Sequence, residues 1–505
     1  MFDLDYHALL PEGILAITVL VTLVVDLVTR KKQLVAVTAI IGMFAALVPV
    51  VTLAFCDSLA FCTSTGAERV LFGGSYVVDG YSLILKGLFI SAAFVVLLLS
   101  VGYLSSDRYY QGEYYFLLVA SALGAVVMAS SRDFITMIVA LELVTGPAFL
   151  LVGWRKGDEK SNEASIKFFI IGVLALALTL FGVSLLYGLT GSQQFDGIAA
   201  AAASLEDVPL FILGVIFVII GFGFKVSAVP FHLWTPDTYE GAPTPVAAWL
   251  SVGSKAAGFV ALLSVAYLAL PSVASIWGPL LWVLAVLSMF FGNLVAIKQT
   301  NILRLLGYSS IAQAGFMLAP FGASAASGAD ELAAQFAATV TYLVIYAVMT
   351  LGAFAVVIVI GSRLGSYELK DWRGLNMYAP GLSLGLAAFF MSLAGIPPLA
   401  GWFAKFAMFS ATIGVGNWWG YSIAIIAALN AVIAFVYYAK VVKTAYFVPV
   451  PDDVDVSMLE NVPVGGPIGF AIGLTAFGVI LLGVYPGFAA NLGEFTTQIF
   501  ASAGL

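Results

Sequence analysis

The stretch that decides the fold is GFGFKVSAVPFHLWTPDTYEGAPTPVAAWLSVGSKA, residues 221–256. It starts at the end of one long apolar run, leads into the next, and carries Lys225 and Lys255 within otherwise apolar sequence. The prolines between the two lysines predict a broken helix, because proline lacks a backbone donor. Within a bilayer, such a break is tolerated only where protein or water satisfies the freed backbone groups. An ionisable side chain at that depth usually marks an ion path, so the stretch predicts part of an ion-conducting core.

The composition places the whole chain in a membrane. Of the 505 residues, 62% are hydrophobic and only 10% are charged, which is not the balance of a soluble globular protein. The acidic N-terminus MFDLDYHALL has no basic region of the kind that starts a cleaved signal peptide, so we expect the first apolar run to remain as a membrane helix. The predicted fold class is an all-α polytopic membrane protein.

Several kinds of cofactor site are absent from the sequence. The chain has only two cysteines and two histidines, whereas an iron–sulfur cluster needs about four cysteine ligands. Neither a P-loop nor a GxGxxG motif occurs. We therefore expect no cofactor and no metal in this chain. Cys56 and Cys62 share one predicted loop, where they form either a disulfide or two free thiols.

A membrane span needs about 20 mostly apolar residues, and the chain contains fourteen such runs. They cover residues 11–29, 34–55, 80–103, 114–130, 134–153, 165–189, 208–228, 243–268, 277–297, 302–320, 335–360, 379–411, 417–446 and 467–490. The run 379–411 is interrupted by Gly395-Ile396-Pro397-Pro398 and is interpreted as one broken helix. We expect four segments: residues 1–106 with three helices, a first repeat at 107–270, a second, inverted repeat at 271–446, and a loop with a final helix at 447–505.

Basic residues separate between alternate loops on this map. One set of loops and span ends holds 14 of the 21 lysines and arginines, the other set holds only Arg69 and Arg132, and the remainder lie within spans. Cytoplasmic loops carry the excess of basic residues. Both termini are therefore predicted to lie on the outer side.

Glu142 and Lys225 are the first candidates for proton transfer. Glu142 follows Asp133 by nine residues, which places it about 14 Å along a helix, near the middle of the bilayer. It is either a proton-exchanging carboxylate or a structural partner of a lysine. If Lys225 lies near Glu142, it can change protonation as the pair forms or separates. The alternative is that Lys225 reaches the inner surface.

Two further lysines lie deep in the later spans. Lys255 is near the middle of its run, and Lys405 follows the second break in what should be the outer half. They are candidates for a central and an exit-side proton site, or else a buried ion pair and a surface-reaching lysine. The two breaks lie in spans of opposite direction, which is typical of inverted repeats with a polar site between them.

The remaining titratable groups within apolar sequence are harder to interpret. Lys167 is near the start of its span and either feeds protons from the inner side or snorkels to the surface. Lys86 is expected to snorkel. His232 is expected to be structural, with a proton relay as the alternative.

Three sequence segments resemble the antiporter-like membrane subunits of respiratory complex I. They are FKVSAVPFHLWTPDTYEGAPTPVAAWLSVGSKAAGF (224–259), GNLVAIKQTNILRLLGYSSIAQAGFML (292–318) and SLAGIPPLAGWFAKF (392–406), and their order and spacing match over nearly the whole chain. Among these subunits, the N type of NADH–quinone oxidoreductase is the most similar. The chain is short, it has Lys405 where the M type has glutamate, and it lacks the long C-terminal lateral helix of the L type.

The resemblance implies a set of roles. Helices 4–8 and 9–13 would be inverted repeats, Glu142 and Lys225 the charged pair of the first half-channel, and Lys255 the central lysine. Lys405 would be the outer lysine and Lys167 a further lysine of the polar axis. The family commonly has histidine in its SSIAH motif, whereas this chain has Gln313, which cannot carry a proton.

The expected function is therefore proton translocation by one subunit of a bacterial NADH–quinone oxidoreductase, in the inner or plasma membrane. Flavin, iron–sulfur clusters and quinone would belong to partner subunits, both membrane and peripheral, and no nucleic acid is expected. The alternatives are a subunit of a multisubunit cation/proton antiporter and a structural membrane subunit.

Overall fold

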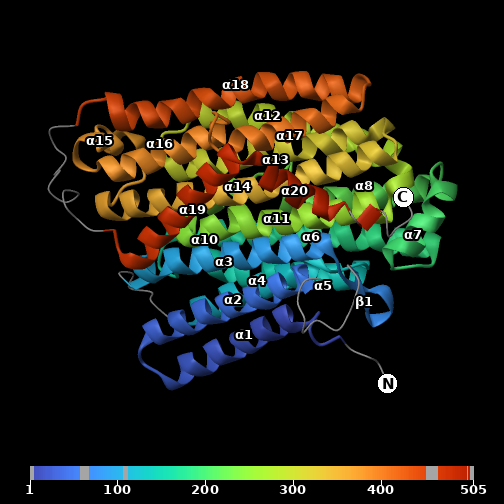
Figure 1. Ribbon diagram of the computed structural model, residues 1–505, viewed down its shortest axis with the longest axis horizontal. Coiled ribbons are helices and arrows are strands. Elements are labelled where there is room, and N and C mark those ends of the chain that lie inside the picture. Colours follow the sequence, from blue (N-terminus) through green and yellow to red (C-terminus); the bar gives the residue numbers. More distant parts are fainter. Residues whose placement is uncertain (1–4, 57–67, 106–111, 451–463, 498, 501–505) are drawn as a thin grey trace.

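The computed structural model describes residues 5–56, 68–105, 112–450, 464–497 and 499–500. It consists almost entirely of helices that run roughly along one direction (Figure 1). The α-helices are α1 (Leu10–Val28), α2 (Lys32–Ala54), α3 (Gly80–Ser105), α4 (Glu113–Ala129), α5 (Phe134–Val152), α6 (Glu159–Thr190), α7 (Phe195–Ala202), α8 (Pro209–Lys225), α9 (Trp234–Gly241), α10 (Thr244–Trp249), α11 (Lys255–Ser264), α12 (Ala274–Lys298), α13 (Ile302–Ala323), α14 (Ala329–Leu364), α15 (Leu375–Tyr378), α16 (Pro380–Ala394), α17 (Gly401–Gly414), α18 (Trp418–Phe447), α19 (Gly466–Val484) and α20 (Pro486–Thr496). Two short strands, β1 (Arg69–Leu71) and β2 (Tyr76–Val78), pair antiparallel, and two π-helical turns, η4 (Leu250–Ser254) and η5 (Val265–Ala269), flank α11.

Each expected span has a helical counterpart. In the described residues, 11 helical stretches are long and apolar enough to cross a membrane. The other spans correspond to the shorter helices α4 and α8 and to the broken pair α16–α17. The predicted all-α polytopic membrane fold is therefore confirmed. The end of the last span was wrong: its helix ends at Val484 rather than at residue 490, because Pro486 begins the separate helix α20.

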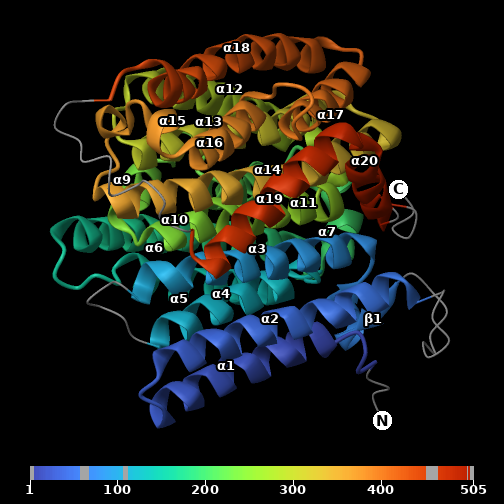
Figure 2. The ribbon, with the colours of Figure 1, turned by 60° about the vertical axis from the view of Figure 1, so that its left-hand side comes forward.

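The centre of the bundle is formed by α14 and by the continuous helix from α10 through η4 and α11 to η5, whose residues are nearly all buried. The pair α1–α2 forms one edge of the bundle and α18 lies at the opposite edge (Figures 1 and 2). Large apolar side chains are exposed on these edge helices, such as Val28 (82%) on α1 and Ile425 (70%) on α18. Such a surface is stable only against lipid or a neighbouring membrane protein.

Where the structure describes them, the segments that connect successive spans lie at alternate ends of the bundle, as the basic residues predict (Figure 1). At one end, here called the basic end, Asn301 pairs with Glu368. At the other end, here called the terminal end, Asp133 pairs with Gln194, and α1 begins and α20 ends there (Figure 1). These pairings agree with the predicted grouping of the four loops that they join. The assignment of the basic end to the cytoplasm stays a prediction.

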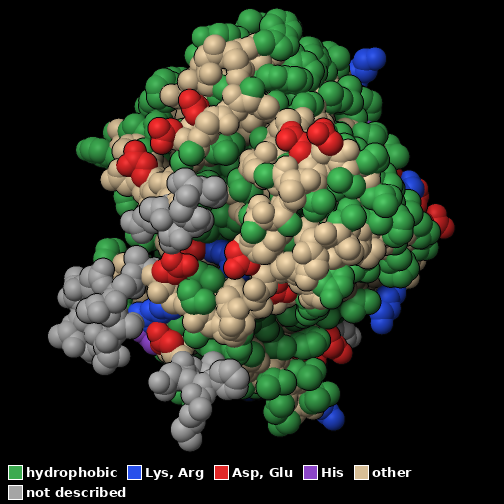
Figure 3. Space-filling view, turned by 90° about the vertical axis from the view of Figure 1, so that its right-hand side faces the viewer, with side chains coloured by type: hydrophobic (Ala, Val, Ile, Leu, Met, Phe, Trp, Pro, Cys, Tyr) green, Lys and Arg blue, Asp and Glu red, His purple; other side chains and the backbone are tan. Residues whose placement is uncertain are grey.

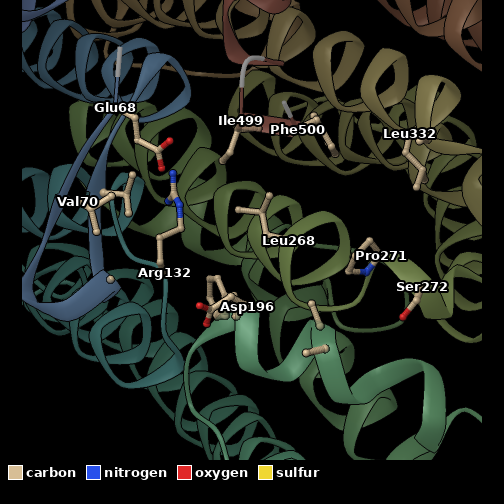
Figure 4. A pocket seen from close by; sticks show the side chains of 16 residues that line it. Glu68, Val70, Arg132, Asp196, Leu268, Pro271, Ser272, Leu332, Ile499 and Phe500 are labelled. Atoms are coloured by element: carbon tan, nitrogen blue, oxygen red, sulfur yellow. The ribbon is translucent and has the colours of Figure 1, made fainter. Parts of the chain in front are cut away.

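The terminal end is hollowed. Figure 3 looks onto this end, where acidic side chains are spread over the face and apolar side chains form its rim. A cavity of about 680 Å³ lies between β1, α7 and the start of α14, and the Arg132 side chain, which lines it, points toward Glu68 (Figure 4). Arg132 is also ion-paired with Asp79 at 2.6 Å, so its charge is already balanced within the protein.

Lys86, in the N-terminal three-helix segment, does not reach the surface. Its side chain is fully buried, and its Nζ lies 2.8 Å from Glu12 Oε1 on α1. Tyr76 donates a hydrogen bond to the same carboxylate oxygen at 2.7 Å. The expectation that Lys86 snorkels was therefore wrong, because α1 supplies a counter-ion inside the bundle.

Cys56, just after α2, is disulfide-bonded, so the alternative of a free thiol is wrong for this residue. Cys62, the other cysteine of the chain, lies outside the described residues. Arg69 of the hairpin contacts Cys56 Sγ at 3.1 Å and pairs with Asp5 at 2.9 Å. These contacts hold the hairpin against the N-terminal helices.

Candidate functional site

The first broken helix places Lys225 in the interior. Lys225 is the last residue of α8 and is only 6% exposed, and its Nζ donates a hydrogen bond to Thr145 Oγ1 on α5. The chain then turns through residues 226–233, where the Val229 N–H donates to Ser288 Oγ at 2.9 Å. Protein groups therefore satisfy backbone that the break sets free, as burial at membrane depth requires.

Glu142 lies on α5 one helical turn before Thr145 and is half-buried. In the described part of the chain, no ion pair joins it to Lys225, whose ammonium is held by Thr145. Three residues of helix correspond to a rise of about 4.5 Å. The structure thus brings the lysine and the carboxylate to the same stretch of α5, while the charged pair itself stays a prediction.

Lys225 also packs directly on the helix that carries Lys255. A Cβ added at Gly258, one turn after Lys255 on α11, would lie 2.7 Å from Lys225 Cβ. Only glycine permits this approach. The first two lysines of the predicted axis therefore lie on helices in direct contact.

Lys255 is 1% exposed and follows the π-helical turn η4. Its Nζ donates to the Ser310 carbonyl at 2.7 Å and to Ser310 Oγ, both on α13. The same hydroxyl forms hydrogen bonds with Tyr239 (3.0 Å) and Tyr346 (3.1 Å). π-helical turns inside α-helices are frequent at functional sites, and here the turn immediately precedes a buried ammonium surrounded by hydroxyl groups.

The second broken helix holds Lys405. This residue lies on α17 and is 6% exposed, and its Nζ donates to the carbonyl of Ala394, the last residue of α16, at 2.6 Å. The ammonium also lies 5.2 Å from the centre of the Phe316 ring. Gly395 allows the turn between the two helices, because its φ of +92° is unfavourable for other residues. A lysine thus occupies the carbonyl end that the break exposes.

Gln313 on α13 lies between the contacts of Lys255 and those of Lys405. Its side-chain amide donates to the Leu393 carbonyl and to the Tyr438 hydroxyl, both at 3.1 Å. Its oxygen accepts from the Tyr342 hydroxyl at 2.6 Å. Leu393 directly precedes Ala394, so the buried Gln313 side chain lies next to the backbone that binds Lys405, one turn along α13 from the residue that binds Lys255.

The hydroxyl groups of this site were not predicted from the sequence. Tyr342 and Tyr346 carry a recognisable signal, because a spacing of four puts them on one face of an otherwise apolar helix. Thr145 and Ser310 carry none. Small polar residues are common in membrane helices, so only their contacts identify them.

Lys167 is not part of this buried site. Its side chain is 42% exposed at the basic end, where it pairs with Glu163 and Asp237, both at 2.6 Å. Asp237 also pairs with Arg304 (2.8 Å), which in turn pairs with Glu240 (2.9 Å). The structure therefore places Lys167 in a surface ion-pair network rather than beside the buried lysines.

This network alters the titration of its carboxylates. Burial alone would raise the pKa of Asp237 and of Glu240. Hydrogen bonds from Lys167 and Arg304 to Asp237, and from Lys160 and Arg304 to Glu240, outweigh burial, so the pKa of each carboxyl lies below its usual value. Both carboxylates are therefore charged at neutral pH.

His232, in the turn after α8, is buried with its ring against Phe291 at 4.6 Å. Its Nδ1 has no hydrogen-bond partner among the residues that the structure describes. Burial lowers the pKa of the His232 ring, which favours the neutral form. The structural interpretation and the relay both stay predictions.

Within the described ranges, the site contains no metal-binding arrangement, but it contains side chains that can exchange protons. No group of three or more histidine, cysteine, aspartate or glutamate side chains is placed there to hold an ion. The groups that the fold brings together are three buried amines, a carboxylate, several hydroxyls and one amide. Amines and carboxylates can gain and release protons.

Known proteins resemble this chain in sequence and in fold. Residues 131–430, which include Glu142, Lys225, Lys255 and Lys405, match the family described as NADH:quinone oxidoreductase/Mrp antiporter, TM. The chain is 42% identical to NADH-quinone oxidoreductase subunit N 2 of Streptomyces griseus over 451 residues, 87% of this chain and 82% of the relative. It is similar to a chain of respiratory complex I from Thermus thermophilus with bound aureothin, with 30% identity, a TM-score of 0.75, and coverage of 95% and 98%. A chain of the Mrp complex from Dietzia sp. shares the fold with a TM-score of 0.82 at 19% identity, over 98% of this chain and 97% of that one.

Proposed function

This chain belongs to the NADH:quinone oxidoreductase/Mrp antiporter transmembrane family, and we propose that it is the proton-translocating N subunit of a bacterial NADH–quinone oxidoreductase. The observation that carries the proposal is the state of Lys225, Lys255 and Lys405. All three are at least 94% buried, and none has a carboxylate within ion-pair distance among the described residues. A buried ammonium without a counter-ion is costly and readily becomes neutral. Such groups are suited to loading and releasing protons.

The proposed path follows the contacts between helices. Approach of Glu142 would hold a proton on Lys225, and separation of the pair would release it. The proton would then pass to Lys255 across the α8–α11 contact and to Lys405 at the second break. Release would occur at the terminal end, which is predicted to face the outside from the distribution of basic residues.

Electron transfer would take place elsewhere in the complex. Flavin, iron–sulfur clusters and quinone would belong to partner subunits, both membrane and peripheral. The exposed apolar side chains of α1, α2 and α18 offer surfaces for neighbouring membrane subunits or lipid. A conformational or electrostatic change in such a neighbour would drive the separation of Glu142 from Lys225.

Substitutions of the buried lysines test this proposal. Lys225→Ala and Lys405→Ala should lower NADH-driven proton uptake by about 100-fold or more, because positioned proton-transfer groups contribute on that scale. Lys225→Arg should not restore it, since a guanidinium stays protonated at any working pH. The matched control is Lys160→Ala, whose side chain is 71% exposed. Wild-type pumping by fully assembled Lys225→Ala complex would refute the proposal.

A cation/proton antiporter subunit is the second candidate, favoured by a family that includes both kinds of protein and by a fold shared with an Mrp chain. The two candidates differ in what accompanies the purified chain. NADH-dependent quinone reduction and co-purifying iron–sulfur subunits support the first. Sodium-driven proton exchange without redox subunits supports the second.

A further inference from the structure

The connection between Lys255 and Lys405 contains one side chain that does not titrate. Lys255 donates to Ser310 on α13, and Lys405 donates to the Ala394 carbonyl at the second break. Gln313, one turn after Ser310, contacts the Leu393 carbonyl next to Ala394. The Gln313 carboxamide thus lies between the two lysine sites, and it neither gains nor loses a proton at working pH.

The hydrogen bonds of Gln313 fix its orientation. The Leu393 carbonyl can only accept, so the NH₂ group must face it, and the second N–H is directed to the Tyr438 hydroxyl. The amide oxygen accepts from Tyr342. Both N–H donors and the oxygen of the carboxamide are hydrogen-bonded, and Gln313 is completely buried. The carboxamide is therefore held in one position between the two lysine sites.

The hydroxyl groups that contact Ser310 lie on the Lys255 side of Gln313. Ser310 accepts from Lys255 and also contacts Tyr239 and Tyr346. The hydrogen bond of Lys405 goes to a backbone carbonyl, which has no proton to pass on, and the Phe316 ring lies beside its ammonium. Among the described residues, no hydrogen bond joins Ser310, Tyr239 or Tyr346 to the Lys405 ammonium, so a proton on this hydroxyl cluster has no direct hydrogen-bonded step to Lys405 while Gln313 keeps its three bonds.

We propose that Gln313 is a gate between Lys255 and Lys405, held shut by Tyr342. The gate rests on the proposed function and adds the residue that controls transfer between the two lysines. It opens when the carboxamide leaves the Tyr342 hydroxyl and water takes its place. The Lys255 ammonium then gives its proton to this water, and the water gives a proton to the neutral amine of Lys405. The balance is one N–H bond broken at Lys255 and one formed at Lys405, with water unchanged.

Proton leak through the resting complex tests the gate. The complete complex is reconstituted into liposomes, a pH difference is imposed without NADH or quinone, and its decay is followed with an internal dye. Gln313→Ala removes the carboxamide and leaves room for water, so decay should be at least threefold faster than in wild type. Adding Lys405→Ala should return the decay to the wild-type rate, because the leak uses that lysine.

A matched control separates this effect from general damage to the bundle. Gln335 is also completely buried and hydrogen-bonded, but it contacts Ser324 and Ser327 at the terminal end. Gln335→Ala should not speed the decay. Tyr342→Phe keeps the ring and removes only the hydroxyl, so it should speed the decay in the same direction as Gln313→Ala, and it serves as the test if the alanine variant fails to assemble.

Two results would overturn the gate. One is an assembled Gln313→Ala or Tyr342→Phe complex as tight to protons as wild type. The other is a leak that persists in the Gln313→Ala/Lys405→Ala variant. These outcomes differ from failure of the proposed function, in which Lys405→Ala alone would leave NADH-driven pumping unchanged.

Discussion

Gly258→Ala is a sharp test of the contact that brings Lys225 to Lys255. The added Cβ would lie 2.7 Å from Lys225 Cβ and 3.1 Å from Val226 Cγ1. The first distance is far below van der Waals contact. Lys225 Cβ is bonded directly to the backbone of α8, so it cannot move aside by a change of rotamer. Overpacking of this kind costs about 1–3 kcal/mol. If the strain is relieved by moving α8 away from α11, the proton step between the lysines should slow by roughly 5-fold to 150-fold, since about 1.36 kcal/mol corresponds to a factor of ten in rate.

The assay is NADH–quinone activity together with proton uptake, in membranes normalised for assembled complex. Gly188→Ala is the matched control, because Gly188 lies in the spanning helix α6 and an added Cβ there meets nothing within 4 Å. Activity of assembled Gly258→Ala within twofold of this control would refute the idea that close α8–α11 packing positions the two lysines.

Three further predictions concern other parts of the chain. Lys86→Met should lower the free energy of unfolding by about 3–5 kcal/mol, because it leaves the Glu12 carboxylate in the bundle without its counter-ion. Adding Glu12→Gln should restore most of the loss, and thermal denaturation of the purified complex measures both effects. Asp237→Asn should reduce thermal stability by a constant amount between about pH 5 and pH 8. The difference from wild type should begin to shrink as the pH falls through about 4, where an unfolded aspartate takes up its proton, and should disappear only below the lowered pKa of the folded Asp237 carboxyl. A cysteine at exposed Lys160 should react with an impermeant reagent from the cytoplasmic side only, and one at exposed Ser204 from the outer side only; the opposite pattern would reverse the orientation.

Particular residues show how far the sequence was informative about the site. Ionisable residues are rare within membrane spans and usually functional. This criterion identified the candidates Glu142, Lys225, Lys255 and Lys405. Burial of the three lysines agrees with their selection. Lys86 met the same criterion and was wrongly expected to snorkel, because the counter-ion lies on a helix distant in sequence.

The sequence by itself determined the fold class, the span map and the positions of the two breaks. These are local properties: a span needs a run of apolar residues, and proline and glycine interrupt a helix wherever they stand. The alternation of loops followed from charge alone, since basic residues gather on one side of a membrane. These signals come from the local sequence and do not depend on contacts between distant segments of the chain.

Only the tertiary structure decided which polar groups meet. Thr145 lies 80 residues from Lys225, and Ser310 lies 55 residues from Lys255, so neither contact leaves a periodic trace in the sequence. The structure also separated Lys167, in a half-exposed ion-pair network, from the lysines at the centre. The physical reason is that a side chain's proton exchange depends on burial and on its neighbours, and both are set by the packing of helices that are distant in the chain.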